Sequence, residues 1–86
     1  MSSFEKLIER FVYNQNNITI NDVRRLLNDF GYTEKKKPGS ECTFHKRGSY
    51  PFNVPTVKGR HVKRRYVERI VKILELEEYL EEHQGD

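Results

Sequence analysis

The chain has 86 residues, of which 35% are hydrophobic and 34% are charged, so it can bury one modest core and we expect a single domain over residues 1–86. Its one cysteine excludes an intrachain disulfide and favours a reducing compartment. No stretch approaches the roughly 18 apolar residues that a membrane helix needs, and the first residues are too polar for a signal peptide. We therefore expect a soluble, cytoplasmic protein that does not associate with membranes.

The net charge of +3 hides a strong segregation of charge along the chain. The balance is −1 over residues 1–34, +10 over residues 35–72 and −6 over residues 73–86. A solvated surface usually mixes its signs, and a basic block of this size is typical of a protein that binds a polyanion, RNA above all. The alternative is a charged face that only keeps the protein soluble. The acidic end is either an exposed terminal helix or a surface that covers the basic face or docks a partner.

The first segment predicts an amphipathic helix. Ser2 and Glu5 have the spacing of a capping box, in which two side chains satisfy free backbone amides of the first turn. Asn14-Gln15-Asn16-Asn17 ends the helix. The apolar residues of this segment recur at helical spacing, at Phe4, Leu7, Ile8, Phe11 and Val12.

A second helix follows, with Thr19 or Asn21 as its N-cap and Asp22 in its first turn. Gly31 is placed to close it in the left-handed conformation. Its buried face consists of Ile20, Val23, Leu26, Leu27 and Phe30. We interpret the apolar stripes of both helices as core rather than as the lining of a cofactor pocket.

The middle of the chain predicts a three-stranded antiparallel meander over residues 32–37, 41–47 and 50–57, with turns at 38–39 and 47–49. Alternation along the second strand places Cys42 and Phe44 on one face of the sheet, and Glu41, Thr43 and His45 on the other.

The third strand contains two prolines, Pro51 and Pro55, which have no amide donor. It is therefore predicted to be an edge strand or to be interrupted. A long helix begins at about Val62, and its apolar stripe shifts after Leu74, so we expect a bend or a break there.

These elements predict an α+β fold, with a small three-stranded antiparallel sheet, helices packed on one face, and a possible extra helix at the C-terminal end. The order of helices, three strands and a helix that starts with basic residues resembles the double-stranded-RNA-binding fold.

One family with this layout matches more closely. The segment VPTVKGRHVKRRYVERIVK, residues 54–72, resembles the closing segment of HicA toxins, the messenger-RNA-cleaving partners of HicB antitoxins. Gly39-Ser40 followed by Phe44 is similar to the family's Gly-Ser-His-x-x-Phe strand. The resemblance covers roughly residues 20–74. The other residues that carry it are Leu26, Leu27, Gly31, Tyr32, Val54, Pro55, Gly59, Lys63, Val67 and Ile70.

Two departures from the family pattern concern catalysis. Glu41 stands where the family has its catalytic histidine, and Val57 stands where it has a second histidine. The resemblance therefore implies the fold and RNA contact more directly than it implies cleavage.

Cleavage of RNA without a metal needs a base for the 2′-hydroxyl, an acid for the leaving 5′-oxygen and cations for the phosphorus centre. Glu41 is the candidate base, and His45 and His61 are the candidate acids. Four residues along a strand span about 13 Å, which is too far for Glu41 and His45 to act directly on one phosphodiester. The alternative is that Glu41 is an exposed carboxylate that offsets local repulsion.

No metal and no cofactor is predicted. The three histidines are scattered, and Cys42 has no Cys or His neighbour at zinc-ligand spacing. Cys42 is more typical of a small buried hydrophobic residue than of a nucleophile.

The basic residues are the strongest functional signal. Lys63, Arg64 and Arg65 open the last long helix, where backbone N–H groups and the helix dipole already favour phosphate. Phosphate contacts position a protein without reading sequence, so we expect a weak base preference. The predicted nucleic-acid-binding residues are Lys35, Lys36, Lys37, Lys58, Arg60, Lys63, Arg64, Arg65 and Arg69.

The sequence thus predicts a HicA-like RNA-binding toxin, an active or degenerate endoribonuclease whose partners are RNA and a HicB-like antitoxin. One alternative is a nucleic-acid-binding module without catalysis. Another is an adaptor whose basic face meets an acidic protein.

Overall fold

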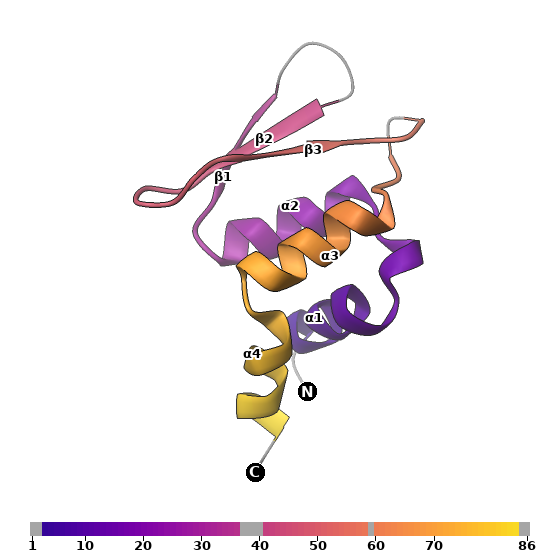
Figure 1. Ribbon diagram of the computed structural model, residues 1–86, viewed down its shortest axis with the longest axis vertical. Helices are drawn as coiled ribbons and strands as arrows, with labels where there is room; N and C mark the ends of the chain where they lie inside the picture. The colour runs from indigo at the N-terminus through magenta and orange to yellow at the C-terminus, as the bar shows by residue number, and fades with distance from the viewer. Residues whose placement is uncertain (1–2, 37–40, 59, 85–86) are drawn as a thin grey trace. The chain divides into compact units, whose positions relative to one another are not determined.

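The computed structural model describes residues 3–36, 41–58 and 60–84 (Figure 1). These residues form an α+β fold with a three-stranded antiparallel sheet, which confirms the predicted class, and the extra C-terminal helix is present. The elements in chain order are α1 (Ser3–Tyr13), the 3-10 helix η1 (Gln15–Asn17), α2 (Ile20–Asp29), β1 (Thr33–Lys36), β2 (Glu41–His45), β3 (Phe52–Pro55), α3 (Arg64–Ile73) and α4 (Leu76–Gln84).

The chain divides into two compact units. The sheet unit, Thr19–Val62, is continuous and contains α2 and the three strands. The helical unit combines the two ends of the chain, Met1–Ile18 and Lys63–Asp86, and contains α1, η1, α3 and α4. The expectation of one domain over the whole chain stays a prediction.

The strands of the sheet unit lie in the order β1-β2-β3, so β2 is central. Phe44 on β2 lies opposite Glu34 on β1 and opposite Phe52 on β3. The strands are shorter than predicted, and β3 is an edge strand, as its prolines require. Pro51 precedes β3 and Pro55 ends it, so neither ring removes a donor from the middle of a ladder.

The face of the sheet that carries Cys42 and Phe44 meets α2, which runs beneath the strands in Figure 1. Tyr32 stacks on Phe52 with 5.2 Å between the ring centroids, and Phe44 meets Phe52 edge to face. The apolar core of this unit includes Val23, Leu26, Leu27, Cys42, Phe44, Phe52 and Val54, all of which are buried.

The opposite face of β2 carries Glu41, Thr43 and His45, as the alternation predicts. Thr43 is nevertheless only 3% exposed, because it occupies the middle of the central strand between Lys35 and Asn53. Its hydroxyl donates to Oδ1 of Asn53 at 2.7 Å, which satisfies the buried polar group. Glu41, at the end of the strand, stays exposed.

Of the two predicted caps of α2, the structure has Thr19, which forms a capping box with Asp22. Thr19 is the N-cap: its Oγ1 accepts from the backbone N–H of Asp22 at 3.4 Å, and its own N–H donates to Oδ2 of Asp22 at 3.0 Å. Gly31 has a φ of +89° and closes the helix in the left-handed conformation, as predicted.

In the helical unit, α1 packs on both α3 and α4. Phe4 meets Tyr79 edge to face, with 6.0 Å between the ring centroids. The predicted cap residue Ser2 lies outside the described residues. The buried residues of these helices include Leu7, Ile8, Phe11, Val67, Ile70, Val71, Leu76 and Leu80.

The predicted break in the last helix occurs between Ile73 and Leu76, where Glu75 adopts a φ of +54°. α3 begins at Arg64, two residues later than predicted, because His61 pairs with Val57 and Lys63 is extended. None of the described helices has both the length and the apolarity that crossing a bilayer requires.

Candidate nucleic-acid interface

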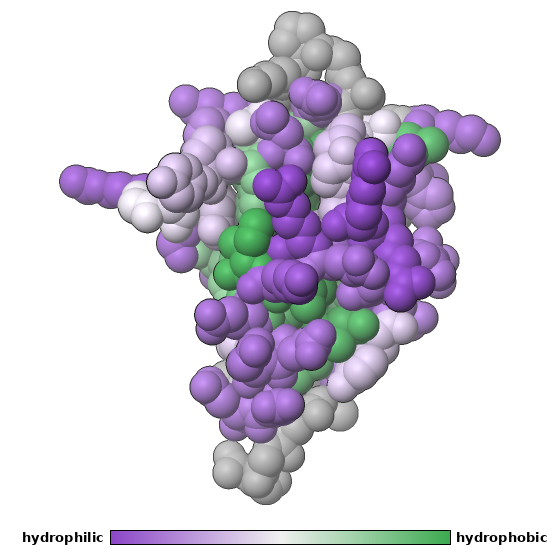
Figure 2. All heavy atoms as spheres, viewed as in Figure 1, coloured by the Kyte–Doolittle hydropathy of each residue, from purple (hydrophilic) through white to green (hydrophobic). Residues whose placement is uncertain are grey.

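Three consecutive exposed cations begin α3. Lys63 is the N-cap with φ −65° and ψ 146°, no side chain caps the helix, and Arg64 and Arg65 fill a first turn without acidic residues. Each cation opposes the helix dipole at a cost of about 0.3–1 kcal/mol, whereas the same dipole and the free amides favour an anion. Figure 2 shows strongly hydrophilic side chains gathered over the start of α3.

The contacts of these side chains are weak. Nε of Arg64 bonds to Glu68 at 3.0 Å and to Gln15 at 3.3 Å, but the Arg64–Glu68 pair is largely exposed and contributes about 0–1 kcal/mol. The guanidinium of Arg65 lies 5.0 Å from the ring centroid of Tyr66. Arg69 is exposed one turn beyond Arg65. A phosphate that approached α3 would therefore displace little.

A second group of cations lies in the turn after β3. Val57 and His61 exchange two backbone hydrogen bonds of 2.7 and 3.0 Å, and the carbonyl of Arg60 accepts from the N–H of Ile20 at 2.8 Å. The turn is thus fixed to the start of α2. It surrounds a hollow of about 720 Å³ that is lined by Val57, Lys58, Arg60 and His61.

Of the three predicted lysines at the end of the first strand, Lys35 is exposed on β1. It shares the Thr43 face of the sheet. Lys37 and the side chain of Lys36 lie outside what the structure describes. The nine predicted basic residues fall in different units: Lys35–Lys37, Lys58 and Arg60 in the sheet unit, and Lys63, Arg64, Arg65 and Arg69 in the helical unit.

The candidate catalytic residues separate along the sheet. His45 ends β2 opposite Thr33, and Glu41 begins β2 opposite Pro55, so the two lie at opposite ends of the same strand face. β3 leaves the sheet at Pro55 and leads into the turn that carries His61. Glu41 therefore lies at the end of the sheet from which the chain continues toward His61, and His45 lies at the other end. In the ranges that the structure describes, no three His, Cys, Asp or Glu side chains group as metal ligands.

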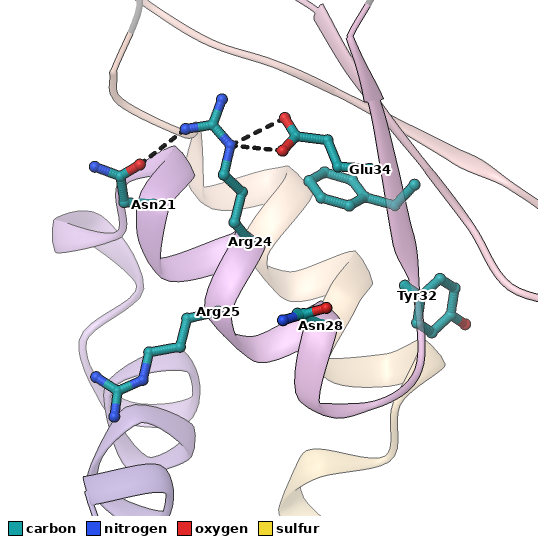
Figure 3. Close-up of a pocket in the computed structure, with 7 residues that line it drawn as sticks. Asn21, Arg24, Arg25, Asn28, Tyr32 and Glu34 are labelled. Atoms are coloured by element: carbon teal, nitrogen blue, oxygen red, sulfur yellow. Dashed lines mark hydrogen bonds and ion pairs between the residues drawn. The ribbon is translucent and has the colours of Figure 1, made fainter.

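A separate hollow of about 380 Å³ lies between α2 and β1 (Figure 3). Nε of Arg24 contacts both carboxylate oxygens of Glu34, at 2.8 and 2.9 Å. Nη1 of the same side chain donates to Oδ1 of Asn21, and Nη2 lies 3.8 Å from Sγ of Cys42. Hydrogen bonding to Glu34 raises the pKa of Arg24. Burial raises the pKa of the Cys42 thiol, and the bond to Glu34 adds to that effect. These contacts hold α2 against β1. We therefore interpret the residues around the hollow as stabilising the fold rather than as binding a ligand.

One polar segment that was not among the predicted site residues also lies beside the basic helix α3. The amide run Asn14–Asn17 lies against α3, and Tyr13 beside it is 71% exposed. In the sequence this run has the composition of a helix terminator. The signal that could have singled it out is four consecutive amides directly after a tyrosine.

The units differ in charge as well as in structure. The sheet unit has nine Lys or Arg and four Asp or Glu, a net charge of +5, and the helical unit has seven and nine, a net charge of −2. The basic start of α3 and the acidic α4 therefore belong to the same unit. A search of protein-family models, curated proteins and solved structures finds no match to this chain.

Proposed function

We propose that this chain is a HicA-like, RNA-binding protein of a toxin–antitoxin system, an active or degenerate messenger-RNA endoribonuclease. The observation that carries the proposal is the exposed triplet Lys63, Arg64 and Arg65 at the start of α3. Such a triplet is unfavourable for the isolated helix and favourable for a bound phosphate, so an anionic ligand accounts for it.

If the chain cleaves RNA, Glu41 accepts the proton of a 2′-hydroxyl, and the oxygen attacks the adjacent phosphorus. The bond from phosphorus to the 5′-oxygen breaks, and that oxygen takes a proton from His61, leaving a 2′,3′-cyclic phosphate and a free 5′-hydroxyl. Neighbouring cations stabilise the charge that develops on phosphorus. No metal or cofactor takes part in this scheme.

A second candidate function is RNA binding without cleavage. It is favoured by the position of His45, which lies about four residues along the strand from Glu41, roughly 13 Å. Glu41 then has no acid partner on its own strand. The general acid that protonates the leaving oxygen would have to be His61, in the turn after β3.

In either case we expect the protein partner of this chain, in the cell that produces it, to be an acidic, HicB-like antitoxin. A surface that binds RNA without base selectivity has to be shielded, and a negatively charged protein is complementary to it. Such a partner would cover residues 63–69 and the Glu41 face of the sheet.

The proposal is tested by replacing Arg64 and Arg65 together with glutamate. Two lost phosphate contacts should reduce the slope of log Kd against log salt by about 1.4 for single-stranded RNA and weaken binding for every sequence. The fold should survive, because glutamate in the first turn of a helix is favourable. The measurement is fluorescence anisotropy with labelled RNA over a series of salt concentrations.

The matched control is the combination Lys6→Glu with Lys72→Glu, which changes two exposed cations of the same unit by the same charge. We expect it to leave most of the affinity intact. Equal losses in the two double variants would mean that RNA responds only to net charge, and an unchanged salt slope in the arginine variant would reject α3 as the contact surface.

A further inference from the structure

A small polar hollow in the helical unit combines three kinds of side chain that recognise an unpaired base. It measures about 200 Å³. This is smaller than the roughly 300–1,000 Å³ of pockets that enclose drug-sized ligands, so one flat ring is a suitable occupant. Its polar and aromatic lining consists of Tyr13, Asn14, Gln15, Asn16, Asn17 and Arg64.

The aromatic element is Tyr13, the last residue of α1, which is 71% exposed. An exposed tyrosine offers a flat surface for a base, and stacking on aromatic rings is the general way in which proteins hold single-stranded nucleic acid. One exposed aromatic residue is ordinary on a protein surface. Tyr13 is a candidate for stacking on a base because it lies at the edge of a hollow lined with amides.

The amides are free to bind. The side chains of Asn14, Asn16 and Asn17 have no hydrogen-bond partner among the described residues, and all three are exposed. Each amide offers a donor and an acceptor side by side. Adenine presents a complementary pair at N6 and N7, so an amide can meet it with two hydrogen bonds.

The turn that carries the amides is held in place. The N–H of Asn14 donates to the carbonyl of Arg10 at 2.8 Å, and Nη2 of Arg10 donates to the carbonyl of Asn17 at 3.1 Å. Ile18, directly after the turn, is fully buried. The amides are therefore presented by an ordered turn, which lowers the entropy lost on binding.

Arg64 connects the hollow to the basic start of α3. Its Nε donates to Oε1 of Gln15 at 3.3 Å, and it lines the hollow itself. A nucleotide whose base lies in the hollow would therefore have its phosphate beside Arg64. The proposed phosphate surface and the hollow are continuous within one unit.

We propose that Tyr13 and the amide turn Asn14–Asn17 form a base-binding site for single-stranded RNA, with a preference for adenine. This rests on the proposed RNA binding and goes beyond it, because phosphate contacts alone predict no preference among bases. A base in a duplex is stacked and paired, so double-stranded RNA would be bound through phosphates without using the site.

The test compares short labelled homopolymers of adenine, uracil and cytosine, together with an RNA duplex, at one fixed salt concentration. The parent should bind the adenine strand more tightly than the others. Tyr13→Ala should weaken binding of single strands by about 5- to 150-fold, the range that alanine substitution gives for a stacked base. Tyr13→Phe keeps the ring and should retain the affinity, and binding of the duplex should change by less than about twofold in both variants.

Asn14→Ala combined with Asn16→Ala should reduce the preference for adenine by about 5- to 150-fold while Tyr13 still supports stacking. The matched controls are Tyr50→Ala, which removes a tyrosine that is 93% exposed in the other unit, and Asn28→Ala, which removes an exposed amide there. Both should behave as the parent, and circular dichroism should show that all variants are folded.

The outcomes separate the two proposals. If the parent binds no RNA, the proposed function and the base site both fail. If the parent binds RNA with strong salt dependence but has no preference for adenine, or if Tyr13→Ala and the double amide variant match the parent, the base site is rejected and phosphate binding stands.

Discussion

Glu41 is the residue on which the choice between enzyme and binder depends, because it lies at one end of β2, exposed, where the HicA pattern has a histidine. His45 lies at the other end of the strand, and the register of β3 brings the His61 turn to the end where Glu41 lies. The catalytic roles of Glu41, His45 and His61 stay predictions.

The substitution Glu41→His should give at least the RNA cleavage of the parent, since a histidine changes its charge near neutral pH and the strand face needs no rearrangement. If the parent is active, Glu41→Gln should lower the cleavage rate by about 10²- to 10⁴-fold, the usual contribution of a general base. The measurement is single-turnover cleavage of labelled RNA, with 2′,3′-cyclic phosphate as the diagnostic product.

The histidines provide the comparison for this experiment. His61→Gln should reduce cleavage, whereas His45→Gln should reduce it less, because His45 lies about 13 Å from Glu41 along the strand. A parent without activity and a Glu41→His variant that gains none would leave RNA binding as the only function.

Cys42 gives a prediction about pH. Burial, and then its hydrogen bond with Glu34, raise the pKa of the thiol in the folded protein, which means that folding favours the neutral form. This contribution to stability is present below the pKa of the unfolded thiol, about 8.5, and is lost as the pH rises through the folded pKa. The alkylation rate of Cys42 should therefore rise at higher pH in the folded chain than in the chain unfolded by urea.

Glu34→Gln should move the alkylation profile of the folded chain toward that of the unfolded chain, because it removes a carboxylate that opposes the thiolate. Profiles with the same midpoint in folded and unfolded protein would show that Cys42 is not held in its neutral form.

At the scale of elements, the junction between α3 and α4 stores strain. Glu75 has a φ of +54°, a left-handed conformation that costs a residue with a Cβ about 1–2 kcal/mol. The conformation turns the chain so that α4 packs on α1, with Leu76 and Leu80 buried.

Glu75→Gly should raise the free energy of unfolding by about 0.5–1 kcal/mol, because the relief of strain exceeds the extra entropy of glycine in the unfolded chain. Urea denaturation measures the change. The control is Glu78→Gly, at an exposed position within α4, which should destabilise the protein by about 1 kcal/mol. A loss of stability in both variants would contradict the assignment of strain to Glu75.

At the scale of the whole molecule, the charge of the chain is distributed between two units rather than among three blocks. The sheet unit is strongly basic, and the helical unit contains both the basic start of α3 and the acidic α4. On the proposed function, two basic surfaces are available to RNA and to a protein that competes with it.

Co-expression with the product of a neighbouring gene that encodes a small acidic protein should give a stable complex, detected by size-exclusion chromatography. RNA and rising salt should both compete with the partner, since all three act on the same charges. The Arg64→Glu, Arg65→Glu variant should lose the partner as well as RNA. Failure of every neighbouring product to bind would count against the toxin proposal while leaving RNA binding intact.

The helices of this fold and their boundaries follow largely from local patterns in the amino-acid sequence. The apolar spacing of α1 and α2, a cap at Thr19 or Asn21, the left-handed Gly31 and an interruption after Leu74 are all visible in the sequence. Each of them depends on residues within a few positions of one another.

Which residues these elements bring together depends on the tertiary contacts. The burial of Thr43, the position of Glu41 opposite Pro55, and the position of Asn14–Asn17 against α3 depend on strand register and on contacts between distant segments. The surroundings of the charged side chains also depend on tertiary contacts. Periodicity shows which face of a helix is polar, but not which other elements lie beside that face. The run Asn14–Asn17 has the composition of a helix end in the sequence, and only the tertiary contacts place α3 beside it.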